Sequence, residues 1–395
     1  MSAFKITIIV ILSVLLFFSL NILAAGIAVD RTILNTGYIN SAIEKLDLPA
    51  VMQEAVNDNP DEGLPPEALE SLVYAVGSLE AEIKTRLGYA VTDVYEYIRG
   101  GTSQIDLPRV LRNSLLADEF INSFIGKLDI KAISHDIAME MTRESVPGEI
   151  SYYVDLPGSV DKVIQDNEPQ LKSQLQKAAC SIAAWLTGES GSADSRIDIE
   201  PLIEDLRQLL VEDFIQAPPA YLAGFSEQEI TAEFNRLFDQ YTSSVPRDID
   251  IIQMVSDNDL KAEFDDATAI TETALVEARD AASIFKTAFI ISVVTVFVLG
   301  VLIVLVHANA GRALFNLGIV LVVCGLFVLA AVLIGKSLIP REAFLPYEAQ
   351  SVITNWAAGT IHAAFNPVLV TGLVYLALGI LMNGTYFVMK RQERY

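Results

Sequence analysis

The stretch Tyr38–Val56 reads YINSAIEKLDLPAVMQEAV, and a similar stretch, FINSFIGKLDIKAISHDIA, follows at Phe120–Ala138. Ile-Asn-Ser, a further isoleucine, Lys-Leu-Asp and an alanine recur in register, and the apolar positions have the spacing of one helix face. Recurrence of a unit along a chain is typical of folds that stack copies of one supersecondary element. We therefore predict that residues 30–261 are built from copies of one helical unit.

Helix-breaking residues divide this region into copies of unequal length. Repeat 1, residues 30–104, is expected to contain a long amphipathic helix over Pro65–Arg99, and repeat 2, residues 105–196, a long helix over Ser159–Leu186. A partial third repeat occupies residues 197–261. No stretch alternates apolar and polar residues for long, so we predict that the fold class is all-α.

Shorter helices are expected in each repeat. One covers Pro49–Val56, and another runs from Asp106 to Ile121. The partial repeat opens with Ile197-Asp198-Ile199, which echoes the Ile105-Asp106-Leu107 of repeat 2.

Four apolar runs are each long enough to cross a bilayer, which takes about 20 residues. They are Ile6–Val29, Thr287–Val306, Ala313–Gly335 and Val368–Met389. We interpret residues 1–29 as an anchor rather than a cleaved signal peptide, because its apolar core exceeds the usual length of about 7–15 residues. Residues 287–389 are predicted to form a three-helix transmembrane bundle, in which glycines spaced seven apart allow close helix contact. These are Gly311, Gly318 and Gly325, then Gly372 and Gly379. The first span is expected to pack against the bundle through Ala24 and Ala28.

Basic residues flank these runs unevenly. They are Lys5 before the first run, Arg312 between the second and third, and Lys390, Arg391 and Arg394 after the last. Basic residues favour the cytoplasmic side of a membrane. We therefore expect a multi-pass protein of the plasma membrane with both termini, including the tail 390–395, in the cytoplasm and residues 30–285 outside it.

The negative charge is concentrated in the predicted extracytoplasmic region. The chain has 395 residues and a net charge of −23, with a mean hydropathy of +0.41. Residues 30–285 carry 47 acidic against 19 basic side chains. Such a region repels nucleic acid, so we expect no nucleic-acid partner. Adaptation to high salt explains the acidity equally well. Cys324 falls in an apolar run, so a disulfide with Cys180 is not expected.

Two segments connect the outer region to the bundle. Ala262–Lys286 is alanine-rich and lacks a helix breaker, so we expect a helical stalk that continues into Thr287–Val306 as one rod. The loop 336–367 contains a predicted helix over Ser351–Ala364. Its aromatic residues favour a position on the outer membrane surface, where it could touch the base of the outer region.

The ends of the two long helices share a pattern. Tyr97-Ile-Arg-Gly precedes Ile105-Asp-Leu, and Trp185-Leu-Thr-Gly precedes Ile197-Asp-Ile. This pattern resembles one in uncharacterised prokaryotic multi-pass membrane proteins with a duplicated helical extracytoplasmic domain. The resemblance covers most of residues 30–250. It implies an envelope protein, and it brings no activity or catalytic residue with it.

The residue patterns indicate no catalytic or cofactor site. Nucleotide-binding and nucleophile motifs are missing from the sequence. The histidines, which are His135, His307 and His362, are scattered, whereas zinc ligands converge. The candidates for cation ligands are Asp257, Asp259, Asp265 and Asp266. Their spacing does not match a calcium-binding loop, and helix capping explains them better. We therefore expect no enzyme activity, no cofactor and no metal.

These sequence features are compatible with three functions. The first is a non-enzymatic envelope protein whose acidic helical region binds a protein partner or a second copy of the chain, or has a structural role at the cell surface. The second is a protein that binds or transports a lipid or apolar ligand in a cavity between the repeats. The third is a sensor or accessory subunit of a membrane complex. An ion-coupled pump is disfavoured because the spans lack interior ionisable residues.

Overall fold

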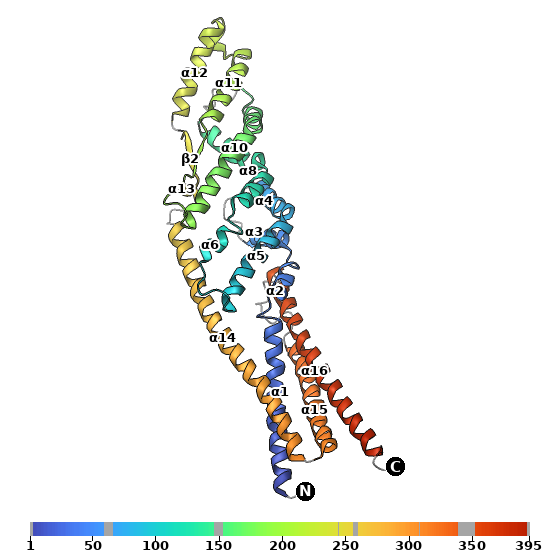
Figure 1. The fold of residues 1–395 in the computed structure, drawn as a ribbon. Helices are drawn as coiled ribbons and strands as arrows, with labels where there is room; N and C mark the ends of the chain where they lie inside the picture. Colours follow the sequence, from blue (N-terminus) through green and yellow to red (C-terminus); the bar gives the residue numbers. More distant parts are fainter. Residues whose placement is uncertain are drawn as a thin grey trace. The chain divides into compact units, whose positions relative to one another are not determined.

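The structure is a computed structural model that describes residues 3–58, 66–145, 153–243, 245–255, 260–307, 309–338 and 352–392. Helices make up nearly all of the regular structure in these ranges, as predicted for an all-α fold (Figure 1). The chain divides into two compact units. Unit 1 comprises residues 1–47, 91–105 and 273–395, and unit 2 comprises residues 48–90 and 106–272.

The four apolar runs all lie in long helices of unit 1. These are α1 (Ala3–Arg31), α14 (Leu260–His307, which enters unit 1 at Thr273), α15 (Ala310–Leu338) and α16 (Val352–Gln392). Each is long and apolar enough to cross a membrane. The stalk and second span form one helix, as predicted, because no glycine or proline interrupts the chain between residues 260 and 299. At 1.5 Å per residue, the 48 residues of α14 extend for about 70 Å, more than twice the thickness of the hydrocarbon core.

One apolar core joins these helices. It comprises Leu16, Leu20 and Ala24 of α1, Leu299 and Ile303 of α14, Val320, Cys324 and Val328 of α15, and Tyr375 of α16. The predicted contact of α1 through Ala24 is therefore confirmed. A polar contact adds to it, because the Asn316 amide donates a hydrogen bond to the Ser13 hydroxyl over 3.1 Å.

The glycines of α15 and α16 bring the two backbones into contact, as their spacing predicted. A methyl group added to Gly379 would lie 2.7 Å from the Gly318 carbonyl oxygen and 2.8 Å from the Val322 nitrogen. One added to Gly325 would lie 2.8 Å from the Gly372 carbonyl oxygen. Side chains at these positions would force the helices apart, and Figure 1 shows α15 and α16 side by side.

The segment predicted as a helix over Ser351–Ala364 is helical from Val352 onward, but it does not form a separate helix. The segment from Val352 onward is the first part of α16 and continues through Pro367 into the last apolar run. Interior proline is tolerated in transmembrane helices, where hydroxyl side chains and neighbouring helices satisfy the freed backbone groups. One turn later, the Thr371 hydroxyl donates to the Pro367 carbonyl oxygen over 2.9 Å, whereas the carbonyl that loses its helical partner is that of Ala363.

The same segment contacts α2 (Thr36–Ile43), so the predicted contact with the start of residues 30–285 is confirmed. The Trp356 indole N–H donates to the Ala42 carbonyl over 2.6 Å. In return, the Tyr38 hydroxyl donates to the Thr360 carbonyl. These two bonds fix α2 beside the start of α16.

Unit 2 contains shorter helices and two brief strands. In chain order these are α3 (Leu48–Asp58), α4 (Pro66–Ser78), α5 (Glu80–Ile98, which enters unit 1 at Val91), α6 (Leu107–Arg112), α7 (Asp118–Lys127), α8 (Ile130–Ser145), α10 (Leu156–Leu186), β1 (Arg196–Asp198), α11 (Glu200–Gln216), the 3-10 helix η1 (Ala220–Leu222), α12 (Glu227–Thr242), β2 (Asp248–Asp250) and α13 (Ile251–Val255).

Two predicted helices are divided in the structure. The helix expected over Pro65–Arg99 is interrupted at Leu79, directly after a Gly-Ser pair of the kind that bends helices. The helix expected from Asp106 to Ile121 ends at Arg112 and begins again at Asp118. There the Ser114 hydroxyl bonds to the Val110 carbonyl over 2.7 Å, a local bond that competes with the helical pattern.

The two recurring stretches have the same local structure. Each is a helix, a break at Leu-Asp and a second helix, formed by α2 and α3 in one case and by α7 and α8 in the other. The Asp129 carboxylate accepts a bond from the Ala132 N–H over 3.0 Å and so caps α8. The duplication itself stays a prediction.

The ends of α5 and α10 also match. Gly100 and Gly188 have positive φ angles of 82° and 79°. The next N–H in each case reaches back five residues, from Gly101 to the Glu96 carbonyl and from Glu189 to the Ala184 carbonyl, both over 2.8 Å. This is the Schellman arrangement, and it explains the aromatic-x-x-Gly pattern because glycine tolerates the left-handed conformation.

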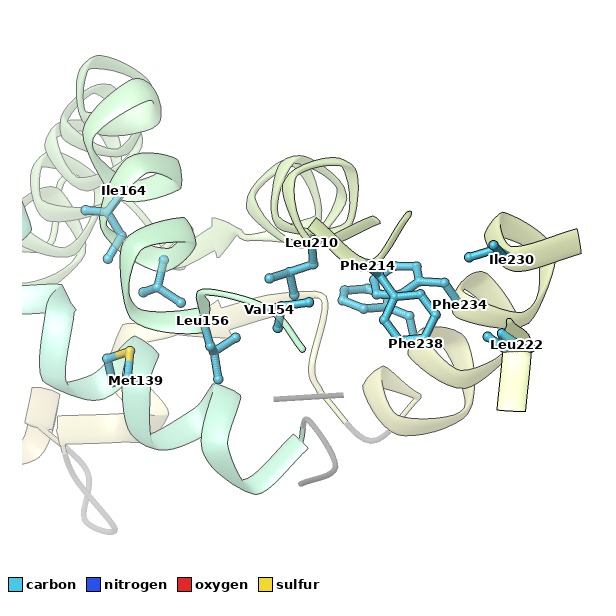
Figure 2. Close-up of a cluster of buried hydrophobic side chains, with 11 residues drawn as sticks. Met139, Val154, Leu156, Ile164, Leu210, Phe214, Leu222, Ile230, Phe234 and Phe238 are labelled. Atoms are coloured by element: carbon cyan, nitrogen blue, oxygen red, sulfur yellow. The ribbon is translucent and has the colours of Figure 1, made fainter. Parts of the chain in front are cut away.

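Unit 2 departs from all-α at one point. β1 and β2 pair antiparallel, with Ile197 opposite Ile249. The larger core of unit 2 lies beside them and centres on Phe214 of α11 and on Phe234 and Phe238 of α12, all at most 2% exposed (Figure 2). Met139, Leu156 and Ile164 extend this core to α8 and α10.

Candidate functional site

A partly open apolar cavity of about 320 Å³ lies within unit 2. Four segments far apart in sequence form its wall. The lining residues are Ile130, Ile133, Ser134 and Ala138 of α8, Val160, Val163, Ile164, Leu171 and Leu175 of α10, Ile197, Ile199, Leu202, Ile203 and Leu206 of β1, α11 and the bend between them, and Val245, Ile249 and Ile251 around β2. The spacing of three and four on α8 and α10 shows that each presents one face to the cavity.

The lining is aliphatic almost throughout. Of the 17 lining residues only Ser134 is polar, and none is charged or aromatic. The Ser134 hydroxyl is already bonded to the Ile130 carbonyl over 2.6 Å. The cavity therefore presents no free side-chain donor and only one hydroxyl acceptor to hold a water molecule or orient a polar ligand, and it suits a flexible hydrocarbon.

Polar contacts on either side of α10 hold the helices around the cavity. Towards α8, the Asp161 carboxylate contacts Lys131 over 3.0 Å and the Nδ1 atom of His135 over 2.6 Å. Lys131, and to a smaller extent His135, hold the pKa of Asp161 below its usual value. Towards α11, the Asn167 amide donates to Asp205 over 2.7 Å. These groups lie outside the aliphatic lining and fix the spacing of its three helices.

The paired strands close another part of the wall. The Asp198 backbone N–H donates to the Gln174 side-chain oxygen over 2.7 Å, and the Gln174 amide donates back to the Asp198 carbonyl over 3.2 Å. The Ser195 hydroxyl bonds the Asp250 carboxylate over 2.5 Å, which links the two strands. β1 is thereby attached both to α10 and to β2, so that Ile197 and Ile249 face the cavity.

Of the four candidate cation ligands, the structure describes Asp265 and Asp266. Asp257 and Asp259 lie outside the described residues. Asp265 contacts the Lys261 ammonium over 2.7 Å, and this ammonium also donates to the Leu186 carbonyl at the end of α10. Asp266 is exposed on α14. Within the described ranges no group of three potential ligands is close enough to hold a metal ion.

The three histidines have separate environments. His135 contacts Asp161, whereas His307 is buried at the end of α14 with Nδ1 2.8 Å from the Ile303 carbonyl. His362 lies within α16. Cys180 and Cys324 are both free thiols, as expected.

Cys180 is expected to react slowly at neutral pH. Burial, with the Asp118 carboxylate adding to it, raises the pKa of this thiol to about 11. The thiolate is the reactive form. In a Cys324→Ala background, the rate of iodoacetamide alkylation followed by mass spectrometry should therefore rise about tenfold per pH unit from pH 8 to 10. A plateau near pH 9, as for an ordinary exposed cysteine, would contradict this environment.

Sequence reasoning raised a cavity between repeats only as an alternative, and it missed the strands. One signal was available. Ile-Asp-Ile occurs at residues 197–199 and again at residues 249–251, and each is a short alternation of apolar and polar residues. In the β1–β2 pair these two tripeptides meet at one position, where Ile197 lies opposite Ile249.

Comparison of the chain with protein-family models, with curated proteins and with solved structures found no match in any of the three.

Proposed function

We propose that this is a membrane-anchored protein that binds the hydrocarbon chain of a lipid or fatty acid in the cavity of unit 2. The observation that carries the proposal is the lining, in which 16 of 17 residues are aliphatic and the single hydroxyl is internally bonded. Of the three functions open from the sequence, it favours apolar-ligand binding. The volume of about 320 Å³ equals roughly ten water-sized groups, which suits about ten methylene groups of a chain.

The aliphatic lining favours an apolar occupant over water. A hydrocarbon chain that covers this partly open lining removes apolar surface from water, which contributes roughly 25 cal/mol per Å² buried. Water in the cavity finds almost no side-chain hydrogen-bonding partners.

The proposed setting is the plasma membrane, with both termini in the cytoplasm and residues 30–285 outside. Four apolar helices and the basic residues at Lys5, Arg312 and Lys390 support it. In this setting unit 2 would receive or deliver a lipid chain on the extracytoplasmic side of the membrane. We propose binding or transfer rather than chemical conversion of the ligand.

The test is ligand binding by the full chain in lipid nanodiscs. The probe is a fluorescent medium-chain fatty acid whose emission rises in apolar surroundings. Ile133→Trp and Leu175→Trp place a larger side chain into the cavity from α8 and α10, and each is expected to weaken binding at least tenfold. The matched control is Ile270→Trp, at a side chain that is 71% exposed in unit 2. Equal affinity in all four proteins would contradict the proposal.

A further inference from the structure

A second cavity, of about 520 Å³, lies in unit 1 where α1 and α5 end beside α14. Its lining is mixed, unlike that of the aliphatic cavity. Leu34, Ile98, Ala282, Phe285 and Phe289 are apolar, whereas Asp30, Arg99, Arg279, Ser283 and Lys286 are polar or charged. Gly100 completes the wall.

This cavity lies at the polar–apolar boundary of two apolar helices. In α1 the apolar run ends at Val29 and Asp30 follows it, whereas in α14 Lys286 comes directly before the apolar run from Thr287. The two helices approach closely here, since a methyl group on Gly26 would lie 2.6 Å from the Phe289 ring. Charged residues that directly flank an apolar run mark the depth of lipid headgroups.

The wall is held by specific contacts. The Arg279 guanidinium donates to the Ser103 carbonyl over 2.8 Å and lies 4.9 Å from the centre of the Tyr97 ring. The Tyr95 hydroxyl donates to the Ile33 carbonyl over 2.8 Å. The end of α5 is thus attached to both α14 and the residues after α1.

The cavity is positive within a strongly acidic region. Three cations line it, which are Arg99, Arg279 and Lys286, against the single carboxylate of Asp30, a net of +2. None of the three forms an ion pair with a carboxylate in the described parts of the chain. Two helix C-termini nearby contribute roughly −0.5 each. The balance stays positive, although residues 30–285 carry 47 acidic against 19 basic side chains.

We infer that this cavity binds the phosphate headgroup of an anionic phospholipid, a site separate from the proposed chain-binding cavity. Arg99 and Lys286 are exposed and free to contact phosphate oxygens, and Arg279 adds a fixed positive charge. Phe285 and Phe289, stacked with ring centres 6.0 Å apart, provide an apolar wall for the glycerol end of the acyl chains. A free phosphate would use the cations alone, whereas a lipid would use both halves of the cavity.

The experiment measures lipid binding by the full chain in detergent micelles, using microscale thermophoresis. The probes are short-chain phosphatidylglycerol, phosphatidylcholine of the same chain length, and inorganic phosphate. Wild type is expected to bind phosphatidylglycerol at least tenfold more tightly than either of the others. Arg99→Gln with Lys286→Gln should weaken phosphatidylglycerol binding by about 25-fold, at about fivefold for each cation removed.

Lys336→Gln is the matched control. Lys336 lies at the end of α15 on the same side of the bundle, outside the cavity, and its ammonium is bonded to Asn366 over 3.2 Å. This variant should bind phosphatidylglycerol like wild type. The inference is overturned if the double variant keeps wild-type affinity, if Lys336→Gln loses as much, or if inorganic phosphate binds as tightly as the lipid. Because Arg99 and Lys286 are exposed, the unfolding temperature of the double variant should stay unchanged.

Discussion

Replacing Gly379 by leucine is expected to separate α15 from α16 and to destabilise unit 1 by about 3 kcal/mol or more. The first side-chain atom alone would lie 2.7 Å from the Gly318 carbonyl oxygen and 2.8 Å from the Val322 nitrogen. Both are backbone atoms of a helix, which cannot move aside as a side chain can. The helices must therefore separate and lose the packing that holds this pair together.

The measurement is unfolding by sodium dodecyl sulfate in mixed micelles, followed by Trp356 fluorescence in a Trp185→Phe background. Trp356 reports on unit 1, because its indole is bonded to the Ala42 carbonyl. Gly384→Leu is the matched control, since it lies on the same helix and a side chain there meets open space. Similar midpoints for the two variants would contradict the close contact of α15 and α16.

Phe234→Ala is expected to lower the free energy of unfolding of unit 2 by about 3–5 kcal/mol. The ring is fully buried. Its centre lies 5.3 Å from that of Phe214 and 5.7 Å from that of Phe238, so the substitution removes the middle member of an aromatic cluster (Figure 2). The loss combines the transfer of the ring to water with the cavity that remains.

Urea unfolding of the full chain in micelles measures this effect, with Trp185 of α10 as the reporter in a Trp356→Phe background. The control is Phe225→Ala, which removes the same side chain from a position that is 52% exposed. It should change the free energy of unfolding by less than about 0.5 kcal/mol. Comparable decreases in the free energy of unfolding for Phe225→Ala and Phe234→Ala would contradict the burial of Phe234 in the core between α11 and α12.

Features that depend on local sequence could be predicted. The four apolar helices follow from runs of apolar residues, and the α14 rod follows from the absence of a breaker near Lys286. The glycine contact between α15 and α16 follows from a spacing of seven. The ends of α5 and α10 are local too, since the conformations of Gly100 and Gly188 are set by the turn that each helix end requires.

Features that depend on contacts between residues far apart in the sequence could not be predicted. β1 and β2 are each three residues long and lie 50 residues apart in the sequence, so neither has a convincing strand pattern until the other is placed beside it. The continuation of α16 through Pro367 depends on packing in the bundle, where α15 and α2 lie against it. The sequence analysis ended the loop 336–367 at this proline, a residue that favours a helix boundary.

The cavity is the feature that is hardest to predict from the sequence. Ile133, Leu175 and Ile203 have the spacing and chemistry of ordinary core residues, and their sequence cannot distinguish a filled core from a lined space. A cavity is decided by whether side chains from α8, α10, α11 and the strands meet across the centre. In this chain they do not, and about 320 Å³ is left between them.

The most direct test of the proposed function is photo-cross-linking of the full chain in nanodiscs with a fatty acid that carries a diazirine near its chain end. Cross-linked residues are then mapped by mass spectrometry. We expect labelling of the cavity-facing residues of α8, α10 and α11, such as Ile133, Leu175 and Ile203, and loss of that labelling with excess unmodified fatty acid. Labelling confined to the apolar helices α1, α14, α15 and α16 would contradict it.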